Sequence, residues 1–381
     1  MGLLGTVSVN AAADPAKPAG TLLKAAPIET KLKGASAWKV RYLSKDIHDA
    51  PHEVTGLVMA PSAKGKDRPI VTWTHGTTGL GDAACPSAQP DPARELTAYF
   101  DGGSSQQIDY GVPGVQGMID RGYVVCATDY QGLGTSEVHH YMVSTTNARD
   151  GLFLAHAARQ LDAGAGLRVV GYGWSQGGAA AASLAELPDA DFGPLELRGT
   201  VALSPAIASF ALLNPTGMAA ALVDTKRAPD SHLLMVLWGF AAGYPRLDPA
   251  DVFTPLGLKL MQESWQVQPV HHLDGTISRN FRLKGAILRS PPRNFEAWKQ
   301  AILESSAGRL KPRCPVLMCV DAFEGGTVVP VPWQHDYAKA VQALGGQIET
   351  QNFPDDDHFS LPFSAQKLVA GWMEKILDSR P

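Results

Sequence analysis

The chain has 381 residues, of which 45% are hydrophobic and 18% charged, and its formal net charge is −4. This composition indicates a globular chain that can bury a sizeable core. The small net charge gives no bulk attraction toward nucleic acid or an anionic membrane, so neither is expected as a partner. No apolar run reaches the roughly 18 residues of a membrane-spanning helix.

The N-terminal segment is expected to lie outside the fold. Residues 3–14 combine a short apolar stretch with small residues, as at the end of a signal peptide, but no basic segment precedes them. We interpret residues 1–20 as the remnant of a secretion signal, with a disordered leader as the alternative. The folded domain is then expected over residues 21–381, in a secreted or periplasmic protein.

The first half of the chain alternates strand and helix patterns. Two alternating apolar–polar stretches, residues 38–47 and 53–60, predict an antiparallel pair at a sheet edge. Apolar runs predict further strands at residues 69–74, 123–128, 167–170 and 198–205. Three- and four-residue apolar spacing predicts helices at residues 112–121 and 147–162.

Residues 206–312 interrupt this alternation, and the rest of the chain resumes it. Amphipathic helical patterns occur in the interruption at residues 231–242, 255–267 and 295–305, so we interpret residues 206–312 as an inserted, largely helical cap. Strands are predicted again at residues 315–320 and 347–353, and helices at 331–344 and 364–377. Such alternation predicts a mostly parallel, doubly wound α/β sheet.

The sequence Gly173-Trp174-Ser175-Gln176-Gly177 fits the pattern G-x-S-x-G. A predicted strand precedes it and an Ala- and Leu-rich helical stretch follows it, which is the setting of the nucleophile elbow in α/β-hydrolases. Glycines on both sides leave room for the crossing strand and helix, while the serine takes a strained conformation. We therefore predict Ser175 as a nucleophile, against the alternative of a Gly-rich turn with an incidental serine.

A serine hydroxyl needs a base, and in this fold the chain order is nucleophile, acid, histidine. His358 lies between the last predicted strand and the closing helix, where that order places the base. Two carboxylates, Asp321 and Glu324, follow the strand ending at Val320, and either could orient the imidazole. His75, which precedes the serine, is expected to brace a loop.

The oxyanion hole requires backbone N–H groups. We predict one from Gln176, the residue after the nucleophile, and one from Thr77, in the loop after the strand ending at Thr74. Four cysteines occur without a C-x-x-C pair, so no zinc or thioredoxin-like site is predicted. A disulfide between Cys85 and Cys314 is possible but not deducible.

Taken together, these motifs resemble the secretory lipase family, the family of Candida antarctica lipase A. The resemblance rests on residues 75–79 (HGTTG), 85–87 (CPS), 127–134 (ATDYQGLG), the elbow, residues 327–330 (TVVP), and Asp357 with His358. It implies an α/β-hydrolase core with a helical cap, a Ser-Asp-His triad, no cofactor, secretion and hydrolysis of carboxylic esters. The family pattern G-x-x-D-x-V-V-P is broken here, because Gly326 stands directly before the TVVP sequence.

The alignment of this sequence with the family pattern favours Glu324 as the triad acid. Counted from Val316, the family-like pattern of five strand residues followed by G-x-x-D reaches Glu324, three residues beyond Asp321. Asp321 would then bind loop amides at the strand end. The predicted site is thus Ser175, His358 and Glu324, with Asp321 as the alternative acid.

The leading hypothesis is a secreted serine esterase or lipase that acts on a small-molecule ester or lipid, without metal or cofactor. It allows contact with a lipid interface. The alternatives are another serine acyl hydrolase or acyltransferase, such as an amidase or peptidase, and a non-catalytic binding protein on a hydrolase scaffold. Six apolar cap residues are candidates for the roof of an acyl site, or for the core of the cap itself: Phe210, Leu213, Leu234, Trp238, Phe240 and Trp265.

Overall fold

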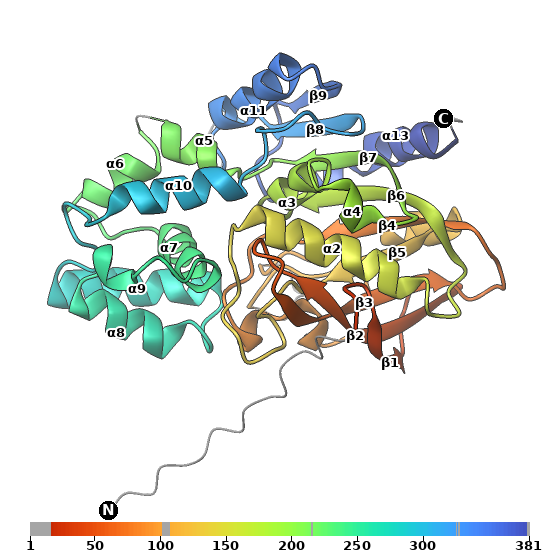
Figure 1. The fold of residues 1–381 in the computed structure, drawn as a ribbon, viewed down its shortest axis with the longest axis horizontal. Helices are drawn as coiled ribbons and strands as arrows, with labels where there is room; N and C mark the ends of the chain where they lie inside the picture. Colours follow the sequence, from red (N-terminus) through yellow and green to blue (C-terminus); the bar gives the residue numbers. More distant parts are fainter. Residues whose placement is uncertain (1–16, 101–106, 215, 325, 327, 379–381) are drawn as a thin grey trace, which may run out of the picture.

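The computed structural model describes residues 17–100, 107–214, 216–324, 326 and 328–378. Most of the predicted signal-peptide remnant therefore lies outside the described residues. The described chain forms a central sheet flanked by helices on both faces, with a group of helices at one end (Figure 1).

The sheet has nine strands in the described residues, in the order β1-β2-β3-β5-β4-β6-β7-β8-β9. Strands β1 to β3 pair antiparallel and β3 pairs antiparallel with β5, whereas all pairs from β5 to β9 are parallel. The strands are β1 (Leu22–Ile28), β2 (Ala35–Lys45), β3 (Pro51–Pro61), β4 (Arg68–Thr74), β5 (Val124–Thr128), β6 (Ala165–Trp174), β7 (Glu196–Leu203), β8 (Val316–Asp321) and β9 (Ile348–Phe353).

Every strand after β1 was predicted from its apolar pattern. The edge strand β1 was not, because its sequence LLKAAPI does not alternate and contains Pro27. A proline lacks an N–H donor and is tolerated only at an edge of this kind. The central strands β4, β5, β7 and β8 are almost wholly buried toward their carboxyl ends, as parallel strands between two helical layers must be.

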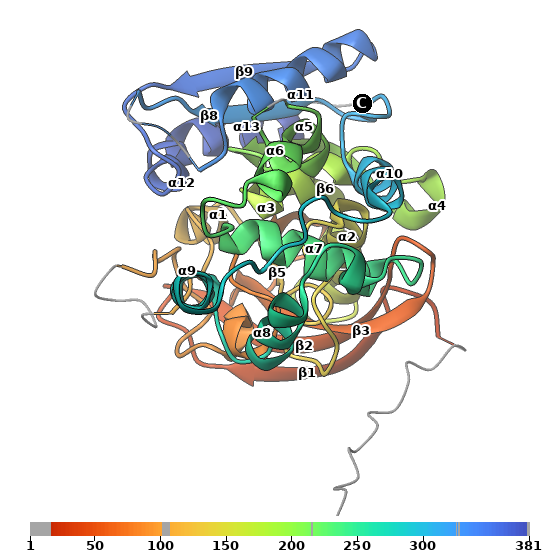
Figure 2. The ribbon, with the colours of Figure 1, turned by 90° about the vertical axis from the view of Figure 1, so that its left-hand side faces the viewer.

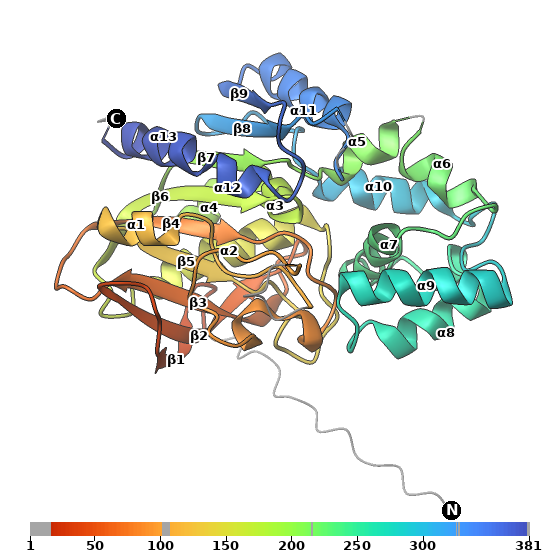
Figure 3. The same ribbon diagram turned by 180° about the vertical axis from the view of Figure 1, so that it is seen from behind.

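Helices cover both faces of the sheet. Figure 1 shows α2, α3 and α4 in front of it, and Figure 3 shows α1, α12 and α13 on the opposite face. Short 3₁₀ turns also occur at Asp82–Ala84, Pro86–Ala88 and Pro249–Asp251. The helices outside the cap are α1 (Val115–Asp120), α2 (Ser144–Ala158), α3 (Gln176–Leu184), α4 (Asp189–Phe192), α11 (Val331–Ala343), α12 (Leu361–Ser364) and α13 (Gln366–Asp378).

The segment between β7 and β8 is largely helical and gathers at one end of the molecule (Figure 1), the end that faces the viewer in Figure 2. Its helices are α5 (Ala208–Leu213), α6 (Met218–Val223), α7 (Ser231–Gly243), α8 (Pro255–Ser264), α9 (Val270–Lys284) and α10 (Phe295–Ser305). Its apolar core is continuous with the sheet, because one buried cluster joins Leu234 and Phe240 of α7 to Met318 and Val320 of β8. These helices therefore pack against the sheet end as part of one core.

The four cysteines are free and buried. The Cys85–Cys314 disulfide that the sequence left open is therefore not formed. Cys85 lies in the loops at the carboxyl ends of the parallel strands, where Ser87 N–H donates to Asp129 directly after β5. Cys314 stands two residues before β8, at the amino ends of the strands, so the sheet keeps the two thiols apart. Within the described ranges, each helix is too short or too polar to cross a bilayer.

Candidate active site

Ser175 stands at the turn between β6 and α3, at the carboxyl edge of the sheet. Its backbone has φ 59° and ψ −117°, a conformation that L residues rarely adopt and that carries strain. The turn is held by backbone bonds to the end of the neighbouring strand β7: Ser175 N–H donates to the oxygen of Leu203 at 2.9 Å, and Ser175 O accepts from Ala206 at 3.0 Å. The predicted elbow geometry is thus present.

The glycines around Ser175 are required by close packing. A Cβ atom on Gly177 would lie 1.8 Å from the Thr74 oxygen, and one on Gly173 would lie 2.0 Å from the Gly177 oxygen. In addition, the Thr74 hydroxyl donates to the Gly177 oxygen at 2.8 Å. The prediction that glycines leave room for the crossing strand and helix is confirmed.

His358 lies buried in the loop after β9, beside the elbow. The indole Nε1–H of Trp174, the residue before Ser175, donates to the His358 oxygen at 3.0 Å. The two rings also lie 5.3 Å apart between centroids. His358 Nδ1 lies 3.0 Å from Asp321 Oδ2. Among the described residues, no group forms a hydrogen bond with the other ring nitrogen, Nε2. The ring therefore has one nitrogen engaged with a carboxylate and the other available.

Asp321 is fully buried at the last position of β8. Its other oxygen, Oδ1, accepts from Gln334 Nε2 at 2.6 Å, so both oxygens have partners. The Ser204 Oγ lies 3.0 Å from His358 Nδ1, next to the carboxylate contact. Asp321 and Ser204 thus contact Nδ1 of the imidazole, and Gln334 holds the carboxylate of Asp321.

Glu324 lies exposed in the turn that follows β8, and among the described residues it makes no contact with His358. The register placed Glu324 beside the histidine, whereas in the structure Asp321 contacts His358. The physical reason is that the carboxyl end of β8 faces the histidine loop, and three residues later the chain has left the sheet edge.

Sequence reasoning missed Ser204 and Gln334. Ser204 directly follows the buried strand β7, and this place at the same sheet edge was a usable signal. In the structure its φ is 41°. Gln334 is a buried position on α11, and nothing in its local sequence distinguishes it from a packing residue.

The predicted oxyanion donors lie on either side of the elbow. Gln176 is the first residue of α3, and Thr77 lies in the loop after β4; both are buried. In the part of the chain that the structure describes, neither backbone N–H donates to a protein acceptor. A helix N-terminus with free N–H groups favours negative charge. His75 is buried in the same loop, and its Nδ1 lies 2.6 Å from the Gly76 oxygen, as expected for a bracing residue.

A cavity of about 460 Å³ opens at Ser175. Its volume falls in the range of small-molecule sites, and its walls are mostly apolar. It is lined from the sheet edge and the cap by Tyr141, Met142, Ala206, Ile207, Ala208, Ala211, Met218, Ala221, Leu233, Val236, Val328, Val329 and Trp333. Asp230 and His232 add one polar pair, with Oδ1 and Nδ1 3.0 Å apart.

The six cap residues expected as a roof do not line this cavity in the described structure. Leu234 and Phe240 are fully buried in the core, and Leu213 is 60% exposed to solvent. The cavity instead uses small side chains of α5 and α6, and the burial of Leu234 and Phe240 matches the alternative that these residues form the core of the cap. No group of three or more His, Cys, Asp or Glu residues in the described chain could hold a metal ion.

The sheet order, the strained elbow and the helices on both faces define an α/β-hydrolase fold. Solved structures share it. A ligand-bound form of the rice cell wall degrading esterase LipA from Xanthomonas oryzae has a TM-score of 0.70 and 18% sequence identity, covering 95% of this chain and 99% of that one. Candida antarctica lipase A in its closed state has a TM-score of 0.63 and 15% identity, covering 95% and 83%.

At these identities the likeness establishes the fold alone. The fold expected from the resemblance to the secretory lipase family is thereby confirmed. A scan against known protein families finds no match, and a search among curated proteins finds none.

Proposed function

We propose that this protein is a serine hydrolase of carboxylic esters, with Ser175 as nucleophile, His358 as base and Asp321 as the acid that orients the histidine. One observation carries the proposal. A strained serine opens onto an apolar cavity, beside a histidine whose Nδ1 is bonded to a buried carboxylate. The esterases and lipases that share the fold are consistent with this assignment.

The geometry supports a two-stage reaction. With Nδ1–H donating to Asp321, the Nε2 lone pair of His358 accepts the proton of Ser175 as its oxygen attacks the ester carbonyl. The developing oxyanion is bound by the N–H groups of Gln176 and Thr77. The imidazolium returns the proton to the departing alcohol, leaving an acyl-enzyme. Water, deprotonated by the same nitrogen, then releases the acid and regenerates the serine.

The cavity suits the acyl part of the ester. Its walls are mostly apolar and include Ser175, so a hydrocarbon chain there would be removed from water while its carbonyl stays at the nucleophile. We propose a lipid or another small ester with an apolar acyl chain as substrate, with no metal or cofactor. Secretion or periplasmic location is part of the same proposal and rests on the sequence of residues 1–20.

The test is hydrolysis of p-nitrophenyl esters from acetate to long acyl chains by the wild-type protein and Ser175→Ala. We expect turnover by the wild type and a loss in kcat on the order of 10⁴-fold to 10⁶-fold in the variant. A phosphonate inhibitor should label Ser175, read by peptide mass spectrometry. A wild-type protein that binds esters without turnover would instead support the binding-protein alternative, and activity retained within tenfold in Ser175→Ala would exclude this serine.

A further inference from the structure

One loop contacts both halves of the proposed oxyanion hole. This loop, residues 131–141, follows β5 and passes between the elbow and the cap helix α7; a Cβ atom on Gly239 of α7 would lie 2.5 Å from the Tyr141 nitrogen. We call residues 131–141 the supporting loop. Its buried side chains carry polar groups that the reaction outlined above does not use.

The first contact is to Gln176. The side-chain Nε2 of Gln176 lies 2.7 Å from His139 Nε2 and 3.2 Å from Asn147 Oδ1. All three residues are buried and at most 1% exposed. The amide of Gln176 therefore has its two N–H groups directed at two acceptors, which fixes its side chain on one side of the elbow.

Two carbonyl oxygens of the supporting loop determine which atoms donate and which accept in the hydrogen bonds among Gln176, His139 and Asn147. His139 Nδ1 lies 2.8 Å from the Gln131 oxygen, which can only accept, so Nδ1 carries the hydrogen and Nε2 is the acceptor for Gln176. Asn147 Nδ2 donates to the His140 oxygen at 3.3 Å, so its Oδ1 is also an acceptor. Burial lowers the pKa of His139 to about 3, so the ring stays neutral with this one tautomer.

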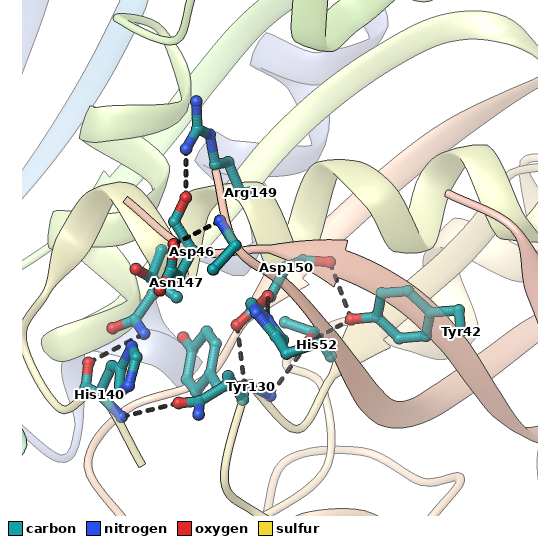
Figure 4. Close-up of polar contacts among 12 residues, drawn as sticks. Tyr42, Asp46, His52, Tyr130, His140, Asn147, Arg149 and Asp150 are labelled. Atoms are coloured by element: carbon teal, nitrogen blue, oxygen red, sulfur yellow. Dashed lines mark hydrogen bonds and ion pairs between the residues drawn. The ribbon is translucent and has the colours of Figure 1, made fainter. Parts of the chain in front are cut away.

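The loop is itself held to the sheet by a buried ion pair. Gln131 N–H donates to Asp150 Oδ2 at 2.9 Å, and Asp150 Oδ1 lies 2.8 Å from His52 Nε2. Figure 4 shows this pair beside Tyr130, together with His140 and Asn147. Strand β3, helix α2 and the supporting loop are thus joined through Asp150, which restrains the loop that carries His139.

The second contact is to Thr77. The Tyr141 hydroxyl lies 2.7 Å from Thr77 Oγ1, and His139 N–H donates to the Leu80 oxygen at 3.0 Å. The loop after β4 is therefore tied to the supporting loop at two points. His139 and Tyr141, two residues apart, reach the two residues whose N–H groups are proposed to bind the oxyanion.

We propose that His139 and Tyr141 are positioning residues that set the spacing of the oxyanion hole through Gln176 and Thr77. The inference rests on the proposed ester hydrolysis. Neither residue is expected to contact the reacting atoms through these bonds. They act by holding the two backbone donors where the charge develops, because such donors stabilise a transition state only when their geometry is fixed in advance.

The test compares His139→Gln with His139→Asn. Glutamine can place Oε1 near the former Nε2 and keep an acceptor for Gln176. Asparagine is too short to do so, although it can still donate to the Gln131 oxygen. We expect kcat to fall roughly 10- to 100-fold in His139→Asn, with KM little changed, whereas His139→Gln stays within about threefold of wild type; full removal of an oxyanion donor sets the upper bound of about 10²–10³.

Affinity for an alkyl boronic acid, which forms a tetrahedral adduct on the serine, should fall in parallel with kcat. Tyr141→Phe should also lower kcat, and its effect should not add to that of His139→Asn if the two residues support one hole. The matched control is Thr72→Val, which removes another buried hydroxyl, bonded to the Gly151 oxygen at 2.7 Å. It should reduce thermal stability and leave kcat unchanged.

The outcomes separate this inference from the function on which it rests. If the wild type hydrolyses esters and Ser175→Ala does not, the proposed function stands. Equal kcat in His139→Asn, His139→Gln and wild type would then overturn the positioning role alone. An equal loss in both variants, matched by equal losses in melting temperature, would show that His139 is only structural and would overturn it too. If His139→Asn does not fold, Tyr141→Phe provides the same kcat and boronate comparison against Thr72→Val.

Discussion

Replacement of His139 by glutamine should change how stability depends on pH. In the folded protein, burial lowers the pKa of His139 to about 3, while its ordinary value is 6.5. The unfolded chain therefore binds a proton below pH 6.5 that the folded chain does not bind until about pH 3. By linkage, His139 contributes stability that is present above its ordinary pKa and is lost as the pH falls below it.

The size of this loss follows from the two pKa values. At pH 8 His139 is neutral in both the folded and the unfolded protein, so its protonation does not change the free energy of unfolding. At pH 5 the unfolded histidine is protonated and gains about 2 kcal/mol relative to the folded one, by RT ln(1 + 10^(pKa − pH)). Glutamine has no proton to bind, so His139→Gln should lose about 2 kcal/mol less stability than wild type between pH 8 and pH 5.

The assay is urea unfolding of both proteins at pH 8, 7, 6 and 5, followed by tryptophan fluorescence. His140, whose pKa burial lowers to about 4, contributes a similar loss to both proteins and cancels in the difference. The difference in free energy of unfolding between His139→Gln and wild type should change below pH 6.5, in favour of the variant, and this change should grow toward pH 5. Curves that stay parallel from pH 8 to pH 5 would refute a neutral, buried His139, and with it the fixed tautomer that accepts from Gln176.

Two further predictions test the site. Asp321→Asn should lower kcat about 10⁴-fold, because an amide cannot hold the histidine in the right tautomer, whereas Glu324→Gln should stay within a few-fold of wild type; the reverse result in steady-state kinetics would restore Glu324 as the acid. Ala211→Phe should fill the cavity and shift preference from long to short acyl esters by about 10- to 200-fold, and Leu213→Ala, on the exposed side of the same helix, should not. Unchanged selectivity in Ala211→Phe would show that the acyl chain does not bind in this cavity.

The elbow could be predicted from the sequence because its geometry is local. Five consecutive residues, a strand before them and small residues after them identify the turn, and the glycines that its close contact with Thr74 requires stand within the motif itself. The strand pattern was equally local, since buried parallel strands are continuous apolar runs. Even α9, which was not predicted, has its apolar residues Val270, Leu273 and Ile277 at helical spacing and buried.

The cavity could not be predicted in the same way. Aromatic side chains were candidates for a roof, yet Phe240 packs into the core shared with β8, and the cavity wall includes Ala208, Ala211 and Ala221. Which face of a cap helix meets the sheet depends on how several helices pack together. That is a long-range property, and a periodic pattern shows only that a helix has an apolar face.

Counting residues along the chain placed the wrong carboxylate beside His358, because the pairing of the strands determines which side chain lies at the sheet edge. A side chain that must meet His358 at the sheet edge has to leave the chain where a strand ends, and β8 ends at Asp321, paired with Phe353 of β9 five residues before the histidine. Three residues further, the chain has left that edge and Glu324 faces solvent. A motif register assumes a fixed loop length, whereas the strand end is set by backbone pairing to its neighbours. A carboxylate at the carboxyl end of a core strand is therefore a stronger predictor of the histidine's partner than its distance from a downstream motif.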